Sequence, residues 1–225
     1  MISVLVPYGY GGPERAAAWK WLEQRWRAIL PDAELIVESG AEDGDPGRFD
    51  KGAAVNRAAA RASGETFAIA DADTAPDPGV AEAFGWGTTV FPARYFALDA
   101  AVTRHVFRHD PSVNLSRFDA PVLETSVGGI VVTPRECFEL VGGLDERAKG
   151  WGGIDAIYAH AVGTLWLEPY TRFGSCWHLW HPRPAEHHWK APYFNETNAL
   201  LQRYSEVAGD PEAMRALIAE GKLVV

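Results

Sequence analysis

Short apolar runs alternate with helical patterns along the first half of the chain. Residues 2–7, 34–38 and 66–70 form apolar runs that are typical of buried strands. Residues 14–30 and 50–63 lie between them and predict helices. The first helix shows apolar side chains at three- and four-residue spacing: Trp19, Leu22, Trp26 and Ile29. Three strands separated by helices predict an α/β fold with a largely parallel central sheet.

The second half of the chain has a less regular pattern. Strands are expected at 88–91, 95–98 and 127–133, and helices at 134–141, 154–162, 193–204 and after Asp210-Pro211. Residues 39–49, 108–125 and 142–153 are expected to be loops. We therefore expect one α/β domain over residues 1–184, with residues 185–225 as a helical tail packed on it.

Composition narrows the class of protein. The chain has 225 residues, 47% hydrophobic residues and 23% charged ones, which is typical of a globular protein. The net charge of −9 argues against general binding to nucleic acid or to an anionic membrane. No apolar run reaches the ~20 residues of a membrane span. Two cysteines are too few for a disulfide framework, so a cytoplasmic protein is expected.

Acidic side chains stand where two of the predicted strands end. Glu38 closes the second strand, and Asp71-Ala72-Asp73 follows the third. Ligands of open α/β sheets bind at the carboxyl ends of the strands. Two carboxylates at such an end can hold Mg²⁺ or Mn²⁺, which in turn can hold a diphosphate. The alternative is that Asp71 and Asp73 are solvated residues of a turn.

A glycine-rich loop precedes the helix predicted at 154–162. Asp155 begins this helix, after Trp151, Gly152 and Gly153. The positive end of a helix favours an ionised carboxylate, which suits a general base acting on a hydroxyl group. Simple capping of the helix by Asp155 is the alternative interpretation.

Histidines gather late in the chain. His178 and His181 lie in the run 177–181, and either imidazole could complete the coordination of Mn²⁺. A separate zinc site lacks a ligand set of the usual spacing. The alternative is that these histidines only pack against the domain or lie on its surface.

These motifs together resemble the metal-dependent nucleotide-sugar glycosyltransferases of the GT-A fold, a Rossmann-like fold. Within that fold they are most similar to the galactosyltransferase-like and N-acetylgalactosaminyltransferase-like branch. The resemblance extends over most of residues 1–182. It rests on the order of the following segments: VPYGYGG, FDKGAAVN, DAD after the third strand, Gly128-Gly129, GGLDE, KGWGGID and WHLWHP.

The resemblance implies a role for each matching position. Asp71-Ala72-Asp73 corresponds to the DxD motif, with Asp73 as the direct metal ligand and Asp71 as a second metal residue. His178 corresponds to the late metal-binding histidine, with His181 as the competing candidate. Asp155 corresponds to the catalytic base of inverting members. The positions that match the donor site are Pro7, Tyr8, Glu38, Arg48, Lys51, Asn56 and Ala72. Those that match the floor under the sugars are Gly128, Gly129, Trp151, Gly152 and Gly153.

Two positions depart from the family pattern. Ile154 stands where a glutamate usually precedes the aspartate and grips an acceptor hydroxyl, so the acceptor is expected to differ or to bind differently. Gly9 stands where an arginine is common after the opening proline, which weakens any inference about the nucleotide. The resemblance also implies no membrane stem, which favours a bacterial or phage enzyme.

The sequence thus predicts an inverting transferase that uses Mn²⁺ or Mg²⁺ and a UDP- or GDP-sugar donor, with UDP favoured. The acceptor stays open among a glycan, a lipid-linked sugar, a small molecule, a protein and a modified base of phage DNA. Two other classes remain. One is a metal-dependent nucleotidyltransferase, and the other is a non-catalytic carbohydrate-binding protein on a degenerate transferase scaffold.

Overall fold

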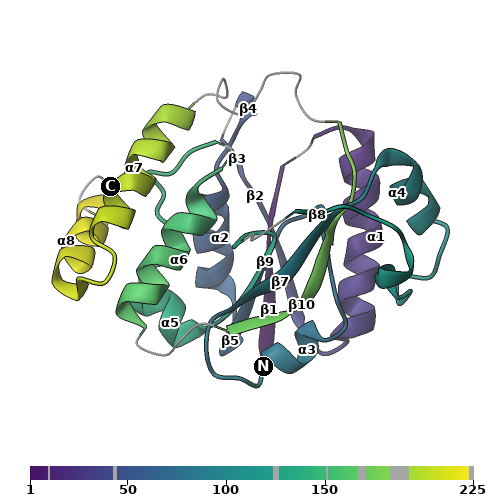
Figure 1. Ribbon diagram of the computed structural model, residues 1–225, viewed down its shortest axis with the longest axis horizontal. Coiled ribbons are helices and arrows are strands. Elements are labelled where there is room, and N and C mark those ends of the chain that lie inside the picture. The colour runs from purple at the N-terminus through teal and green to yellow at the C-terminus, as the bar shows by residue number, and fades with distance from the viewer. Residues whose placement is uncertain are drawn as a thin grey trace.

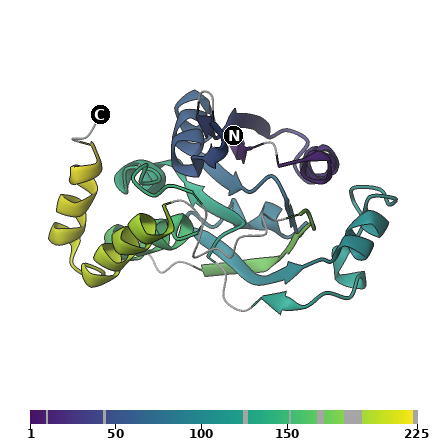
Figure 2. The same ribbon diagram turned by 90° about the horizontal axis from the view of Figure 1, so that it is seen from above.

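The computed structural model describes residues 1–9, 11–42, 45–123, 127–150, 152–166, 171–182 and 193–222. Helices lie on both sides of a central sheet (Figures 1 and 2). The strands are β1 (Ile2–Tyr8), β2 (Glu34–Ser39), β3 (Ala41–Glu42), β4 (Asp45–Phe49), β5 (Thr66–Ala70), β6 (Thr74–Pro76), β7 (Val90–Ala97), β8 (Val122–Leu123), β9 (Ile130–Pro134) and β10 (Thr171–His178). The helices are α1 (Pro13–Ile29), α2 (Lys51–Arg61), α3 (Val80–Ala83), α4 (Ala100–Val106), α5 (Arg135–Leu140), α6 (Ile154–Leu165), α7 (Phe194–Glu206) and α8 (Pro211–Lys222).

The central sheet is mixed. Its strand order is β2-β1-β5-β9-β7-β10-β6, and β8 pairs with β7. Strand β1 runs parallel to β2 and β5, and β7 runs parallel to β10. Strand β9 is antiparallel to β5 and β7, and β6 is antiparallel to β10. The expected α/β fold with a helical C-terminal end is confirmed. The alternation of strands and helices predicted parallel pairing, so the antiparallel pairs were not expected.

Two hydrophobic layers cover the sheet. On one face, α2, α5 and α6 pack on the sheet, and α7 and α8 pack against α6. The aromatic side chains of that layer are Phe67, Phe91, Phe138, Tyr158 and Tyr204. On the other face, Trp26 of α1 is buried over the small side chains of β5. The α7–α8 pair is thus the outermost layer on the α6 side (Figure 1).

Several segments differ from the sequence-based expectation. Strand β6 was not predicted, and β8 pairs with β7 inside the expected loop 108–125. Residues 39–49 contain the antiparallel pair β3–β4 rather than only a loop, since backbone pairing there needs no apolar run. The two strands expected at 88–91 and 95–98 are one strand, β7. Pro92 interrupts the apolar pattern but is accommodated inside β7, where it faces Phe173 of β10 in the register. Strand β10 itself was not expected.

The structure describes no helix that is both long enough and apolar enough to cross a membrane.

Candidate active site

Asp73, His178 and His181 converge on one point. One ligand atom of each lies within 4.8 Å of the others, and Asp73 and His178 are buried. The antiparallel pair β6–β10 brings them together. His178 is opposite Thr74 in the register, and the backbone N–H of Leu179 donates to the Asp73 carbonyl at 2.8 Å. The sequence left open which histidine accompanies Asp73, and the structure brings both to it.

Basic side chains surround the Asp73 carboxylate. His181 Nε2 lies 3.3 Å from Oδ2, and His178 Nε2 lies 3.8 Å from Oδ1. The guanidinium of Arg15, from the first turn of α1, is 3.1 Å from Oδ2. Burial acts to raise the pKa of Asp73, but the hydrogen bond from His181 and the charges of His178 and Arg15 hold that pKa well below its usual value. The carboxylate is therefore ionised and available to a cation.

The donor set fits a divalent transition ion. Carboxylate oxygens suit Mg²⁺ and Mn²⁺, whereas imidazole nitrogens suit transition ions. Two imidazoles and one carboxylate therefore favour Mn²⁺ over Mg²⁺. Three such ligands would leave coordination positions for oxygens of a bound molecule.

Lys51 joins the two other predicted acids. Its ammonium lies 2.7 Å from Asp71 Oδ1 and 2.8 Å from Asp155 Oδ1. Burial acts to lower the pKa of Lys51, but the charges of Asp155 and Asp71 raise it above its usual value. Burial raises the pKa of Asp71 to about 6, opposed by Lys51 and assisted by Asp155 and Asp73. Among the described residues, the Asp71 side chain thus pairs with Lys51 and is not part of the Asp73–histidine cluster.

Two glycines make room for this pairing. A Cβ on Gly128 would lie 2.7 Å from Asp155 Oδ2, so a larger residue would displace the carboxylate. Gly129 has φ +84°, and a Cβ there would lie 2.5 Å from the Tyr95 ring. The Gly129 carbonyl accepts a hydrogen bond from the Asp71 N–H at 2.8 Å. Gly128 and Gly129 therefore hold β9 close to both acids.

The loop before Asp155 is fastened to α7. The Thr197 hydroxyl accepts from the Lys149 N–H at 3.0 Å and donates to the Lys149 carbonyl at 2.8 Å. The Lys149 ammonium contacts Asp50, which caps α2 one residue before Lys51. Gly153 has φ +82°, and a Cβ there would lie 2.9 Å from the Thr197 methyl group. Gly152 is also left-handed, and no described residue outside its chain neighbours lies within 4 Å of where a Cβ would stand; Trp151 lies outside the described residues.

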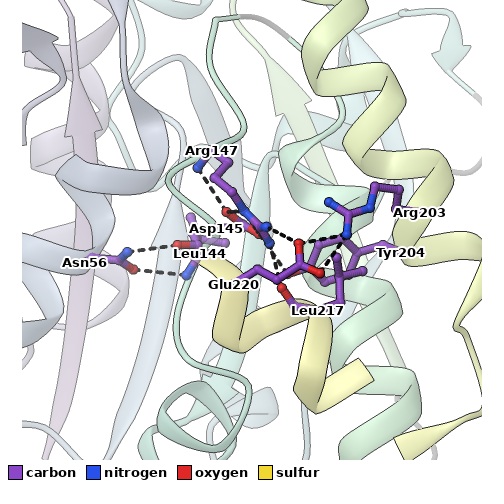
Figure 3. Close-up of polar contacts among 8 residues, drawn as sticks. All are labelled: Asn56, Leu144, Asp145, Arg147, Arg203, Tyr204, Leu217 and Glu220. Carbon is purple, nitrogen blue, oxygen red and sulfur yellow. Dashed lines mark hydrogen bonds and ion pairs between the residues drawn. The ribbon is translucent and has the colours of Figure 1, made fainter. Parts of the chain in front are cut away.

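A polar network holds the earlier part of the same loop (Figure 3). Asp145 accepts from the Arg147 guanidinium at 2.6 Å and from the Tyr204 hydroxyl at 2.8 Å. Arg147 also donates to the Leu217 carbonyl of α8 and contacts Glu220, which pairs with Arg203 of α7. These contacts bind the loop to both C-terminal helices.

The remaining residues that the sequence singled out make contacts of different kinds. Asn56 exchanges two hydrogen bonds with the Leu144 backbone, so its amide holds the loop (Figure 3). Glu38 pairs with Arg61 of α2 at 2.6 Å. Pro7 is opposite Glu38 in the register, and the Tyr8 ring packs against Trp19. The other two are Ala72, which is buried, and Arg48, which lies in β4.

Sequence reasoning missed three residues that surround the site. Arg15 follows the glycine-rich turn at the end of β1, and that position at the binding edge of the sheet was an available signal. Tyr95 packs beside His178, with ring centroids 6.3 Å apart, and burial raises its pKa above its usual value. Thr197 had no distinguishing signal, because a threonine inside an amphipathic helix is an ordinary residue.

No protein-family model matches the chain, and no curated protein matches it. Solved structures do match in fold. Drosophila β1,4-galactosyltransferase 7, in a mutant form with manganese, UDP-Gal and xylobiose, has a TM-score of 0.53 at 16% identity. The alignment covers 76% of this chain and 63% of that one, so the chain spans less than two thirds of the length of that structure.

A second match covers more of both chains. It is glucosyl-3-phosphoglycerate synthase from Mycobacterium tuberculosis, with Mn²⁺, UDP and phosphoglyceric acid. The TM-score is 0.54 at 17% identity, over 93% of this chain and 78% of that chain. At these identities the likeness establishes the fold, which is the GT-A fold that the sequence motifs resemble.

Proposed function

We propose that this chain is a metal-dependent glycosyltransferase that moves a sugar from a nucleotide diphosphate sugar to an acceptor hydroxyl. The convergence of Asp73, His178 and His181 beside the Asp71–Lys51–Asp155 bridge is the observation on which the proposal rests. This arrangement supports a cation site and an ionisable acid at the same edge of a GT-A sheet. Both are needed to activate a departing diphosphate and an attacking hydroxyl.

The donor binds through its diphosphate. Asp73, His178 and His181 would hold Mn²⁺, which supplies charge stabilisation for the nucleotide diphosphate as it leaves. UDP is the favoured nucleotide, because both solved relatives of the same fold contain UDP or UDP-Gal. Pro7, Tyr8 and Glu38, at the ends of β1 and β2, would line the nucleoside, with Arg48 beside it.

Asp155 accepts the proton of the acceptor hydroxyl. The Lys51 ammonium lies 2.8 Å from Asp155 Oδ1, which orders the carboxylate. The Asp155 side chain is 25% exposed, so the carboxylate is also accessible. The freed alkoxide attacks the anomeric carbon, the bond to the diphosphate breaks, and the configuration is inverted. General-base assistance of this kind contributes ~10²–10⁴-fold to a rate.

The acceptor lies against the glycine loop and the C-terminal helices. Among the described residues, none would meet a Cβ on Gly152 within 4 Å, and Thr197 of α7 lies directly beside Gly153. The helices α7 and α8 of the tail predicted at 185–225 therefore form part of the acceptor site, beside the transferase domain predicted at 1–184. Ile154 stands where a glutamate would bind an acceptor hydroxyl. Another residue of the glycine loop or of the C-terminal helices therefore makes that contact.

Nucleotide binding tests the proposal. Thermal unfolding would be followed with UDP, GDP, CDP and dTDP, each with Mn²⁺, with Mg²⁺ and with chelator. Specific binding should raise the free energy of unfolding by ~2.7 kcal/mol at a hundredfold excess over the dissociation constant. A Mn²⁺-dependent shift with UDP, followed by release of UDP from UDP-sugars, is the expected result. No shift with any nucleotide would refute a transferase, and dependence on a nucleoside triphosphate with pyrophosphate release would indicate a nucleotidyltransferase.

A further inference from the structure

Arg15 occupies an unusual position in the site. Its guanidinium approaches the same oxygen of Asp73 that His181 approaches, at 3.1 Å and 3.3 Å. A cation held by Asp73 and His181 would need this oxygen and the space beside it. The guanidinium therefore stands as a counter-ion for Asp73 and competes with any metal ion that binds there.

The guanidinium also has an unsatisfied donor. Arg15 Nε is buried and has no hydrogen-bond acceptor among the described residues. Buried donors in folded proteins are almost always paired, and the described residues supply no acceptor for this one. The Phe49 ring lies 5.7 Å from the guanidinium carbon and supports it from one side. Phe49 in turn packs where a Cβ on Gly9 or Gly40 would stand.

The surroundings of Arg15 favour an anion as that acceptor. Arg15 is in the first turn of α1, a 17-residue helix whose N-terminus has no side-chain cap. Uncapped backbone N–H groups at a helix N-terminus attract phosphate groups. A guanidinium presents a fork of donors that matches phosphate oxygens.

We propose that Arg15 is an exchangeable residue of the donor site. It neutralises Asp73 while the metal is absent, and it moves to the diphosphate of the donor once a divalent cation binds Asp73. Arg15 thus weakens the binding of the metal ion by itself and strengthens the binding of the nucleotide to the metal-loaded protein. This inference rests on the proposed function, because it takes the diphosphate and the cation from it.

The exchange predicts effects of opposite sign in one variant. Calorimetric titration of nucleotide-free protein with Mn²⁺ should give roughly threefold tighter binding in Arg15→Gln, because a competing ion pair is gone. Titration with UDP at saturating Mn²⁺ should give binding weaker by about tenfold to a hundredfold, the range for a lost charge-assisted hydrogen bond. A residue that only supports the fold would weaken both.

Two further variants separate the causes. Arg27→Gln removes the same charge from an exposed position on α1, ~18 Å along the helix from Arg15, and should change neither titration. Arg15→Lys retains the charge but not the fork, so Mn²⁺ binding should stay as in the wild type while UDP binding weakens. If Arg15→Gln left both affinities unchanged, or changed the Mn²⁺ and UDP affinities in the same direction, the exchange would be refuted but the proposed function would not. A wild-type protein that binds neither Mn²⁺ nor UDP would overturn the proposed function itself.

Discussion

Thr197 offers a sharp test of whether the C-terminal helices position the catalytic loop. The substitution Thr197→Val replaces the hydroxyl with a methyl group of similar shape. It removes both hydrogen bonds to the Lys149 backbone, at 3.0 Å and 2.8 Å, from a side chain that is 2% exposed. Valine keeps the methyl group that lies beside Gly153, so this contact is retained.

The expected cost follows from these two bonds. Each neutral hydrogen bond contributes about 1 kcal/mol net, so the free energy of unfolding should fall by about 2 kcal/mol. A chain of this length loses about 2–4 °C of melting temperature per kcal/mol, which gives a drop of roughly 4–8 °C. We also expect kcat to fall, because the lost hydrogen bonds position the loop next to the catalytic residues. Lys149 contacts Asp50 just before Lys51, and Gly153 begins the helix that carries Asp155.

Two measurements decide the outcome. Thermal unfolding of Thr197→Val and of Thr197→Ser, which keeps the hydroxyl, gives the structural cost. Steady-state transfer from the UDP-sugar identified by screening gives kcat and KM. We expect a lower kcat at an unchanged donor KM for the valine variant, and near-normal values for the serine variant. A valine variant with the wild-type kcat would show that α7 does not position the loop, whatever its melting temperature.

Three further predictions concern the acids. Asp155→Asn should bind Mn²⁺ and UDP normally in calorimetry and lose about 10²–10⁴-fold in kcat, and transfer at the normal rate would remove Asp155 as the base. Asp73→Ala should lose Mn²⁺ binding and Mn²⁺-dependent UDP binding together, whereas retention of Mn²⁺ in dialysis would place the metal elsewhere. The pKa of Asp71 is raised to about 6 in the fold, so the folded state binds more protons than the unfolded state between about pH 4 and pH 6. The metal-free protein should therefore gain stability as the pH falls through this window. Asp71→Asn should flatten that slope in thermal scans, and an unchanged slope would assign it to other groups.

The first half of the fold could be predicted because local pattern decides it. The strands β1, β2 and β5 are continuous apolar runs between helices, and parallel strands of this kind bring their carboxyl ends to one edge. That edge is where Glu38, Asp71 and Asp73 lie. The hypothesis of a metal site at Asp73 and of an acid at Asp155 came from these ends and from the glycine loop.

Long-range pairing explains what the sequence did not reveal. Strand β10 pairs with β6 and β7, which precede it by many residues. The local pattern of residues 171–178 does not predict these partners. The donor-site role of Asn56 stays a prediction. Its hydrogen bonds to the Leu144 backbone could not be predicted, because nothing in its neighbours shows that the loop containing Leu144 would lie against α2. Arg15 was overlooked because a charged residue in a first helical turn ordinarily faces solvent.

The place of β10 in the sheet has a consequence for folding kinetics. This strand is inserted between β7 and β6, so its hydrogen bonds close chain segments of about a hundred residues, and contacts of such sequence separation are slow to form. Asp73 and His178 meet only when that closure is complete. Under the proposed function, the affinity for Mn²⁺ would therefore appear only once β10 has joined the sheet. During refolding, metal uptake would report the completion of the native topology, later than any signal from β1, β2 and β5.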